Sequence, residues 1–149
     1  MSLPDIRSVV PHSGRMLLLD RIVASDADTL TAEVTVRADS LFLDGGGVGA
    51  WVGVEYMAQT VAAFAGREAL QHGRQMQPGV LLGTRRFTSN RPLFPLGCTL
   101  RVTARRDTTG DRGLSSFACS IEGDGITAEA VVTVLHGDHA RGLLKGDEA

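Results

Sequence analysis

The chain reads DGGGVGAWVGVEYMAQTVAAFA over residues 44–65, and this stretch decides how the rest is interpreted. It joins a glycine-rich loop to a helical segment that is apolar on almost every side. In its first three turns the helix carries one ionisable group, Glu55, with Gln59 one turn later on the same face. A carboxylate among apolar residues costs free energy unless a partner satisfies it. Glu55 therefore either has a structural partner or takes part in chemistry.

The segments around this helix alternate in the manner of half-buried strands. Period-two alternation is clear at residues 30–37 and 100–105. Turn-forming glycine and proline residues separate the segments. We expect a short helix over residues 3–9, strands over 16–26 and 30–37, and the long helix over 50–72. Four more strands are expected at residues 79–87, 100–105, 116–122 and 126–136.

A long helix that is apolar all round must be covered on most sides. A single curved antiparallel sheet of about six strands, wrapped around the central helix, covers it in an α+β arrangement. This architecture is the hot dog fold. Six strands leave open edges, so we expect a dimer that extends the sheet. Residues 1–137 are predicted to form this single domain, and residues 138–149 a charged tail that frays.

The composition is that of an ordinary globular domain, and it excludes several classes of function. The 149 residues are 43% hydrophobic and 21% charged, with a net charge of -2, so no basic field favours nucleic acid. The N-terminus lacks an apolar signal-peptide core, and the longest uncharged helical run is too short to span a membrane. We expect Cys98 and Cys119 to be buried thiols in a reducing cytoplasm.

Two interpretations of Glu55 remain open on the residues alone. A carboxyl group that burial keeps partly protonated suits general acid or base work near neutral pH. Gln59 could then hold this carboxyl group or bind a substrate oxygen. In the structural interpretation, Glu55 accepts backbone hydrogen bonds or pairs with an arginine from the sheet.

The glycine loop also has two interpretations. Consecutive glycines before a helix leave backbone N–H groups unobstructed, and those groups can polarise a carbonyl or bind an anion. The loop is not a phosphate P-loop, because no Gly-Lys-Ser/Thr follows, nor a dinucleotide fingerprint, because no parallel strand–helix–strand unit surrounds it. A plain flexible loop is the alternative.

Histidine and arginine give weaker signals. We interpret the histidines as solvated or structural, and their spacing predicts no metal site; they are His12, His72, His136 and His139. Arginine recurs at positions 85, 86, 91, 101, 105 and 106. A patch of this kind could dock an acidic carrier protein or a phosphate. The alternative is a solvated face balanced by nearby Asp107 and Asp111.

Three blocks of sequence occur in a specific order. Residues 11–23 read PHSGRMLLLDRIV, residues 55–59 read EYMAQ, and Arg86-Phe87 is followed by RPLFPLG at 91–97. Together they resemble the β-hydroxyacyl-acyl carrier protein dehydratases of the hot dog superfamily, over positions 11 to about 100. The chain is most similar to the short dehydratase-like proteins of aryl polyene and related polyketide-type fatty acid clusters.

The resemblance implies a hydro-lyase that removes water from 3-hydroxyacyl thioesters carried on the phosphopantetheine of an acyl carrier protein. In that family a histidine removes the α-proton and an acidic residue helps the hydroxyl group to leave. By resemblance Glu55 is the acid and Gln59 its neighbour, and Gly47, Gly49 and Trp51 mark the N–H groups near the thioester carbonyl. The resemblance implies no cofactor and no metal.

The chain departs from the family in the loop before the long helix. The family histidine stands there in Phe-x-Gly-His-Phe-Pro, whereas residues 41–49 here read LFLDGGGVG, with Asp44 as the one ionisable group. Asp44 takes over part of the role, or a related dehydratase supplies histidine across a heterodimer, or the chain is a non-catalytic pseudo-dehydratase subunit. An acyl thioesterase, in which Glu55 activates water, is a further alternative. Homodimer, heterodimer or higher oligomer, and the acyl chain length, stay open.

Overall fold

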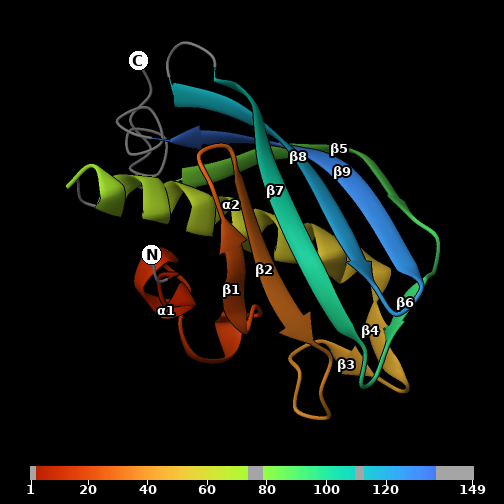
Figure 1. Cartoon of the computed structure of the whole chain (residues 1–149). Helices are drawn as coiled ribbons and strands as arrows, with labels where there is room; N and C mark the ends of the chain where they lie inside the picture. The colour runs from red at the N-terminus through yellow and green to blue at the C-terminus, as the bar shows by residue number, and fades with distance from the viewer. Residues whose placement is uncertain (1–2, 74–78, 110–112, 137–149) are drawn as a thin grey trace.

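The computed structural model describes residues 3–73, 79–109 and 113–136 (Figure 1). Within those ranges the α-helices are α1 (Ile6–Val9) and α2 (Gly53–Gln71), and short 3-10 turns lie at Gly14–Met16 and Ala50–Val52. The strands are β1 (Arg21–Ser25), β2 (Thr29–Thr35), β3 (Leu43–Asp44), β4 (Gly47–Gly49), β5 (Gly79–Ser89), β6 (Leu93–Pro95), β7 (Thr99–Thr109), β8 (Leu114–Gly123) and β9 (Ile126–His136).

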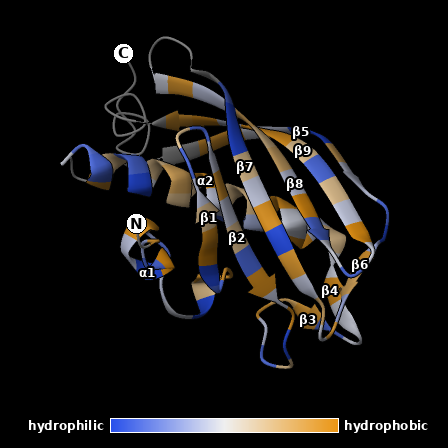
Figure 2. Cartoon of the chain, viewed as in Figure 1, coloured by the Kyte–Doolittle hydropathy of each residue, from blue (hydrophilic) through white to orange (hydrophobic). Residues whose placement is uncertain are grey.

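Six of these strands form one antiparallel sheet in the order β1-β2-β7-β8-β9-β5. The sheet curves around α2, as Figure 1 shows. Hydrophobic and hydrophilic residues alternate along β7 (Figure 2), and buried and partly exposed residues alternate along β8. One face of the sheet therefore packs on the helix and the other faces outward. The predicted α+β class and hot dog fold are confirmed.

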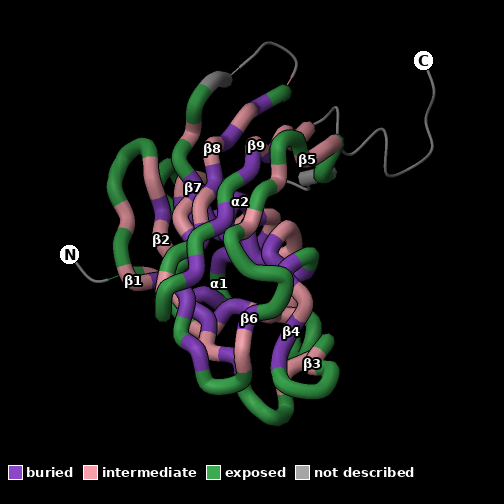
Figure 3. The backbone as a smooth tube through the Cα atoms, turned by 90° about the vertical axis from the view of Figure 1, so that its right-hand side faces the viewer, coloured by how far each residue is buried: buried purple, intermediate pink, exposed green. Residues whose placement is uncertain are grey.

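The core lies between the sheet and α2. Buried backbone gathers there, while exposed residues lie on the outer faces and loops (Figure 3). Leu30, Val102 and Ile121 of the sheet and Met57 and Phe64 of α2 are at most 1% exposed. Each such side chain contributes about 1.5–3 kcal/mol relative to an exposed position, so this layer holds the long helix in place.

The helix α2 runs for 19 residues, which is about 28 Å. It follows directly from the 3-10 turn at Ala50–Val52. It ends at Gln71, and Gly73 just beyond the cap has a φ of 65°, the left-handed conformation that glycine tolerates after a helix. The predicted helix over residues 50–72 is confirmed, with a 3-10 geometry in its first turn.

The N-terminal segment, residues 3–19, packs against α2 on the side that the sheet leaves open. Asp5 caps α1 by accepting a hydrogen bond from the backbone N–H of Arg7 at 2.9 Å. α1 then meets α2 at Gly66, where a Cβ atom would lie 2.0 Å from the carbonyl oxygen of Val9. Glycine at position 66 is therefore required by this close contact between the two backbones.

A buried arginine ties the β1–β2 hairpin to the same helix. The guanidinium group of Arg67 donates hydrogen bonds to the hydroxyl of Ser25 and the carbonyl oxygen of Asp26. It also lies 4.6 Å from the ring centroid of Phe64. Burial lowers the pKa of Arg67 from its ordinary value. Arg67 thus fixes the first hairpin relative to the second half of α2.

Two predicted elements were wrong in detail. The strand predicted over residues 16–26 begins only at Arg21, because the preceding residues form a turn and the N–H of Leu18 donates to a side chain on α2. The glycine loop and the segment around Pro92 form a second, three-stranded sheet, β3-β4-β6. A single domain over residues 1–137 stays a prediction, and the predicted tail, residues 138–149, lies outside the described residues.

Candidate active site

Glu55 lies in the first turn of α2, at the rim of the core. Its neighbours Tyr56 and Met57 are buried, but its own side chain is 44% exposed. The expectation that the apolar helix buries this carboxylate is wrong. The reason is that the sheet covers the other faces of α2, whereas the N-terminal segment only partly covers this one. Glu55 is therefore accessible to a ligand from solvent.

Gln59 holds the carboxylate from one turn below. Its amide nitrogen donates to Oε1 of Glu55 at 3.1 Å and to the carbonyl oxygen of Met16 at 2.8 Å. Its amide oxygen accepts a hydrogen bond from the N–H of Leu18 at 2.9 Å. Gln59 is 1% exposed, and both amide hydrogens are already used within the protein. Its geometry is that of a group that positions Glu55 and docks the N-terminal segment.

Replacing Gln59 with leucine is expected to lower the free energy of unfolding by about 2–3 kcal/mol, because it removes the hydrogen bonds of the buried amide to the partly buried backbone groups of Met16 and Leu18. Chemical denaturation of the purified protein measures this change. The matched control is Thr60→Val, which removes one hydroxyl bond to the carbonyl oxygen of Tyr56 within the same helix. That control is expected to cost less than about 1 kcal/mol. Equal losses in the two variants would contradict the docking role of Gln59.

His12 is the residue of this site that sequence analysis missed. Its Nε2 atom lies 3.7 Å from Oε1 of Glu55, and its side chain is 29% exposed. His12 belongs to the turn at Pro11–Arg15, which has no periodicity that points toward α2. The one signal in the sequence was that His12 belongs to the first of the three sequence blocks, residues 11–23. That block does not show which face of α2 the segment packs against.

The glycine stretch is a tight hairpin, and Asp44 sits at its start. Gly45, with φ 65, helps the chain to turn between β3 and β4. Asp44 is exposed, and no hydrogen bond or ion pair joins it to Glu55. No direct bond therefore links the two predicted catalytic carboxylates, and a joint role of Asp44 and Glu55 stays a prediction.

Packing accounts for one of the glycines proposed to bind substrate. A Cβ atom at Gly47 would lie 2.2 Å from the carbonyl oxygen of Phe94, so β4 can approach β6 only with glycine at that position. At Gly49 a Cβ atom would meet the indole of Trp51, a side chain that is able to move. The N–H of Ala50 already donates to the carbonyl oxygen of Pro92 at 2.9 Å.

Two exposed aromatic residues lie beside this hairpin. Trp51 is 66% exposed and Phe42 is 44% exposed. Their rings meet edge to face with centroids 5.6 Å apart. Large apolar side chains exposed together are typical of a surface that a partner or ligand covers.

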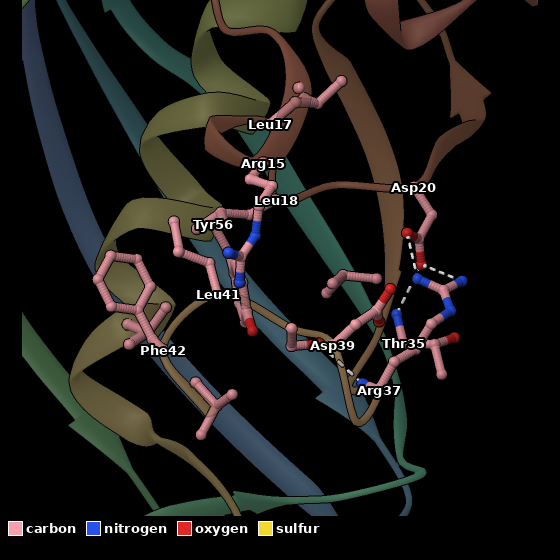
Figure 4. A pocket seen from close by; sticks show the side chains of 15 residues that line it. Arg15, Leu17, Leu18, Asp20, Thr35, Arg37, Asp39, Leu41, Phe42 and Tyr56 are labelled. Carbon is pink, nitrogen blue, oxygen red and sulfur yellow. Dashed lines mark hydrogen bonds and ion pairs between the residues drawn. The ribbon is translucent and has the colours of Figure 1, made fainter. Parts of the chain in front are cut away.

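A cavity of about 340 Å³ lies on the neighbouring side of the N-terminal segment. Figure 4 shows its lining, which includes Leu17, Leu18 and Tyr56, with Asp20 and Arg37 paired at one side. Glu55 does not line this cavity. Leu18 borders both regions, because its side chain faces the cavity while its N–H binds Gln59. The volume lies near the lower end of the range for small-ligand pockets.

The walls of this cavity are held by charge pairing and burial. Arg37 donates to both carboxylate oxygens of Asp20, at 2.8 and 3.1 Å. Asp20 also accepts from the N–H of Thr35 at 2.8 Å. Burial raises the pKa of Tyr56 to about 12. The phenol of Tyr56 therefore stays neutral near pH 7 and lines the cavity as an uncharged group.

Comparison with known protein families identifies the family of this chain. Residues 4–145 match the ApeP-like family, described as ApeP dehydratases. The chain belongs to the ApeP-like dehydratase family. Among curated proteins, none matches the chain.

Solved structures show the same fold in this family and in other hot dog proteins. The dehydratase heterocomplex ApeI:P from Xenorhabdus doucetiae matches with a TM-score of 0.87 and 22% identity, covering 96% of this chain and 99% of that chain. The Escherichia coli PaaI protein from the phenylacetic acid degradation operon matches at 0.58 and 19%, covering 78% and 81%. A hypothetical thioesterase from Streptococcus pneumoniae with coenzyme A matches at 0.61 and 13%, covering 78% and 84%.

The arginines of this ApeP-like chain fall into two groups. One group is paired with acidic residues on a neighbouring strand, on the same strand or on α2; the pairs are Arg101 with Glu33, Arg105 with Asp107 and Arg106 with Glu68. Arg85, Arg86 and Arg91 are exposed and make no ion pair within the described residues. The predicted balance by Asp107 is thus seen for Arg105, whereas Arg101 and Arg106 pair with other carboxylates, and Asp111 lies outside the described residues.

The cysteines, metal-ligating side chains and helix hydropathy of the ApeP-like chain can also be described. Cys98 and Cys119 are free and buried, and burial raises the pKa of the Cys119 thiol to about 12. Among the described residues, no group of His, Cys, Asp or Glu side chains is arranged to hold a metal ion. None of the helices in the described part of the chain is long and apolar enough to cross a membrane.

Proposed function

We propose that this chain is a subunit of a dehydratase that removes water from 3-hydroxyacyl thioesters of an acyl carrier protein, with Glu55 as its acid. The observation that carries the proposal is Glu55 itself, in a chain of the ApeP-like dehydratase family. It is a half-exposed carboxylate at the start of the central helix, held by Gln59. A carboxyl group in that position can exchange a proton with a bound ligand.

The reaction divides into two proton movements. A base removes the α-proton from C2, and the electron pair of that C–H bond forms the C2–C3 double bond. The C3–O bond on the neighbouring carbon breaks and its electron pair stays on the oxygen. That oxygen takes a proton from the carboxyl group of Glu55 and leaves as water. The thioester stays intact and the carrier keeps the acyl group. Glu55 therefore acts on the hydroxyl end of the substrate, and the base acts on C2.

We assign the base to a second subunit. Residues 41–49 contain no histidine, and Asp44 is exposed without a link to Glu55. A related dehydratase that carries a histidine in the corresponding loop would complete the site across a heterodimer. The ApeI:P structure, which is described as a dehydratase heterocomplex, supports this arrangement. A homodimer of this chain would lack that histidine.

The edge strand β5 is where we propose that the subunits join. β5 ends the six-stranded sheet, so one of its edges is unpaired within the described residues. Leu81 and Leu82 on this strand are 42% and 48% exposed. An open edge with exposed leucines is normally covered by another strand. Pairing of β5 with its counterpart in a partner would extend the sheet across both subunits.

The carrier protein is proposed to dock on the exposed arginines of the chain. Arg85, Arg86 and Arg91 have no acidic partner within the described residues, so their charge is available to an acidic carrier or to the phosphate of its pantetheine arm. We also propose that the protein works in the cytoplasm, where buried cysteine thiols remain reduced.

The test is an assay of the chain alone and of the assembly that it forms in its own cells. The tagged chain is purified with any hot dog dehydratase that it retains, and both samples are incubated with a 3-hydroxyacyl group loaded on an acyl carrier protein. Mass spectrometry of the carrier should show loss of one water from the assembly and little from the chain alone. No water loss from either sample would refute the dehydratase role.

Two other outcomes would identify the alternative functions. Release of free acid from a plain acyl carrier would indicate a thioesterase, in which Glu55 activates water. Equal dehydration rates for the original assembly and for the assembly carrying Glu55→Gln would indicate a non-catalytic subunit that only supports its partner.

A further inference from the structure

His12 lies beside Glu55, and this contact carries an inference that rests on the proposed function. Nε2 of His12 and Oε1 of Glu55 are 3.7 Å apart. That distance is too long for a direct hydrogen bond, so neither atom satisfies the other. The side chains are 29% and 44% exposed. Both side chains are therefore partly open to a ligand.

The position of His12 is fixed by contacts on both sides of it in the chain. Before it, Val9 packs against Gly66 of α2 with no room for a side chain. After it, Met16 and Leu18 are hydrogen-bonded to the amide of Gln59. The turn that carries His12 is thus held at both ends on the helix that carries Glu55. The distance between His12 and Glu55 is therefore set by the packing of the N-terminal segment on α2.

The surroundings of the ring determine which nitrogen carries the hydrogen. Nδ1 of His12 is buried and has no hydrogen-bond partner among the described residues. A hydrogen on Nδ1 would be an unsatisfied buried donor, which costs more than an unsatisfied acceptor. The neutral ring therefore carries its hydrogen on Nε2, the nitrogen that faces Glu55. His12 therefore presents a hydrogen-bond donor toward Glu55, and the basic lone pair of the ring lies on the buried Nδ1.

We propose that His12 and Glu55 bind the C3 hydroxyl group of the substrate between them. A hydroxyl oxygen at about 2.8 Å from each atom fits the gap of 3.7 Å between them. A hydroxyl group has two lone pairs and one hydrogen. It can accept the hydrogen bond of Nε2–H and share a proton with Oε1 of Glu55 at the same time.

This arrangement makes His12 a residue that selects hydroxylated acyl groups. Without a hydroxyl group, the Nε2–H of His12 would be covered by the acyl chain and left without a partner, whereas Glu55 would keep only its hydrogen bond from Gln59. When the C3–O bond breaks, the donor of His12 also stabilises the charge on the departing oxygen. The same tautomer leaves removal of the α-proton to another group, in agreement with a base from the second subunit.

The first experiment needs no mutation. The purified assembly is titrated with two pantetheine analogues in which nitrogen replaces the thioester sulfur. One analogue carries a 3-hydroxybutyryl group and the other a butyryl group, each joined through an unreactive amide. Nitrogen-15 NMR of the imidazole rings should show the hydrogen of His12 on Nε2. Its resonance should move with the hydroxylated amide and not with the butyryl amide. His72, at the far end of α2, is the internal control, and its resonances should stay in place.

Variants of His12 then test whether the hydrogen-bond donor or the shape of the ring causes the preference for the hydroxylated amide. His12→Phe keeps a ring without the donor and should reduce the preference for the hydroxylated amide about tenfold, the value of one hydrogen bond of about 1.4 kcal/mol. His12→Gln keeps an N–H donor without basicity and should retain most of the preference. Thermal unfolding of each variant reports whether the fold is intact.

The outcomes distinguish this site from the proposed reaction. An unchanged preference in His12→Phe, or a hydrogen of His12 on Nδ1, would overturn the hydroxyl site even if water loss is observed. Loss of the preference in His12→Gln to the same extent as in His12→Phe would also count against a donor role. A hydroxyl preference that depends on His12, with no water loss from the thioester, would refute the proposed reaction and leave the binding site standing.

Discussion

Replacing Glu55 with glutamine is expected to lower the rate of dehydration by the assembly about a thousandfold. Glutamine has nearly the shape of glutamate and can still form a hydrogen bond with Gln59, but it cannot give a proton to the departing hydroxyl group. The side chain is 44% exposed, so the change should alter the free energy of unfolding by less than about 1 kcal/mol. The rate is measured by mass spectrometry of the loaded carrier protein, and the stability by chemical denaturation.

The matched control is Glu129→Gln, which removes one negative charge from an exposed position of β9. Its rate should stay within about twofold of the original, because a single exposed surface charge is screened by salt. A normal rate in Glu55→Gln would remove Glu55 from the mechanism. A low rate in both variants would show that net charge, and not the carboxyl group, affects the assay.

Replacing Gly66 with alanine is expected to destabilise the protein by about 3 kcal/mol. The new Cβ atom would lie 2.0 Å from the carbonyl oxygen of Val9, and a backbone atom cannot be moved aside as the end of a side chain can. α1 must then separate from α2. Because the same segment carries His12, the preference for a hydroxylated ligand should fall together with the stability. Chemical denaturation and the pantetheine amide titration measure the two effects.

Gly53→Ala in the same helix provides the control. There a Cβ atom would meet the terminal methyl group of Ile121 at 2.9 Å, a contact that a side chain can relieve by a small shift. Alanine also favours the helix by about 1 kcal/mol over glycine. The net change should be below about 1 kcal/mol. Equal losses at positions 53 and 66 would contradict the contact with Val9 as the cause.

The parts of the fold that follow from local pattern were predictable from the sequence. The alternation at residues 30–37 and 100–105 identified β2 and β7, and the apolar run after residue 50 identified α2. The second sheet was missed because β3, β4 and β6 have only two or three residues each, too few to establish a period. Their pairing depends on Gly47 approaching Phe94, a contact between distant parts of the chain.

The candidate site was predictable only in the part that lies on one helix. Glu55 and Gln59 are four residues apart, so their hydrogen bond follows from helical geometry. The exposure of Glu55 and the approach of His12 depend on how the N-terminal segment packs, which no local pattern encodes. The position of Asp44 relative to Glu55 could not be predicted either, because it depends on how the β3–β4 hairpin is oriented relative to α2.

The two hydrogen bonds between Gln59 and the N-terminal segment join residues that are 41 and 43 positions apart. Contacts of such sequence separation form after large loops have closed. A chain in which this segment has not docked lacks both the support of Glu55 and the approach of His12. The site can therefore act only after the N-terminal segment has docked. A partly folded chain that has formed its sheet but not this contact would have no organised site for an acyl group.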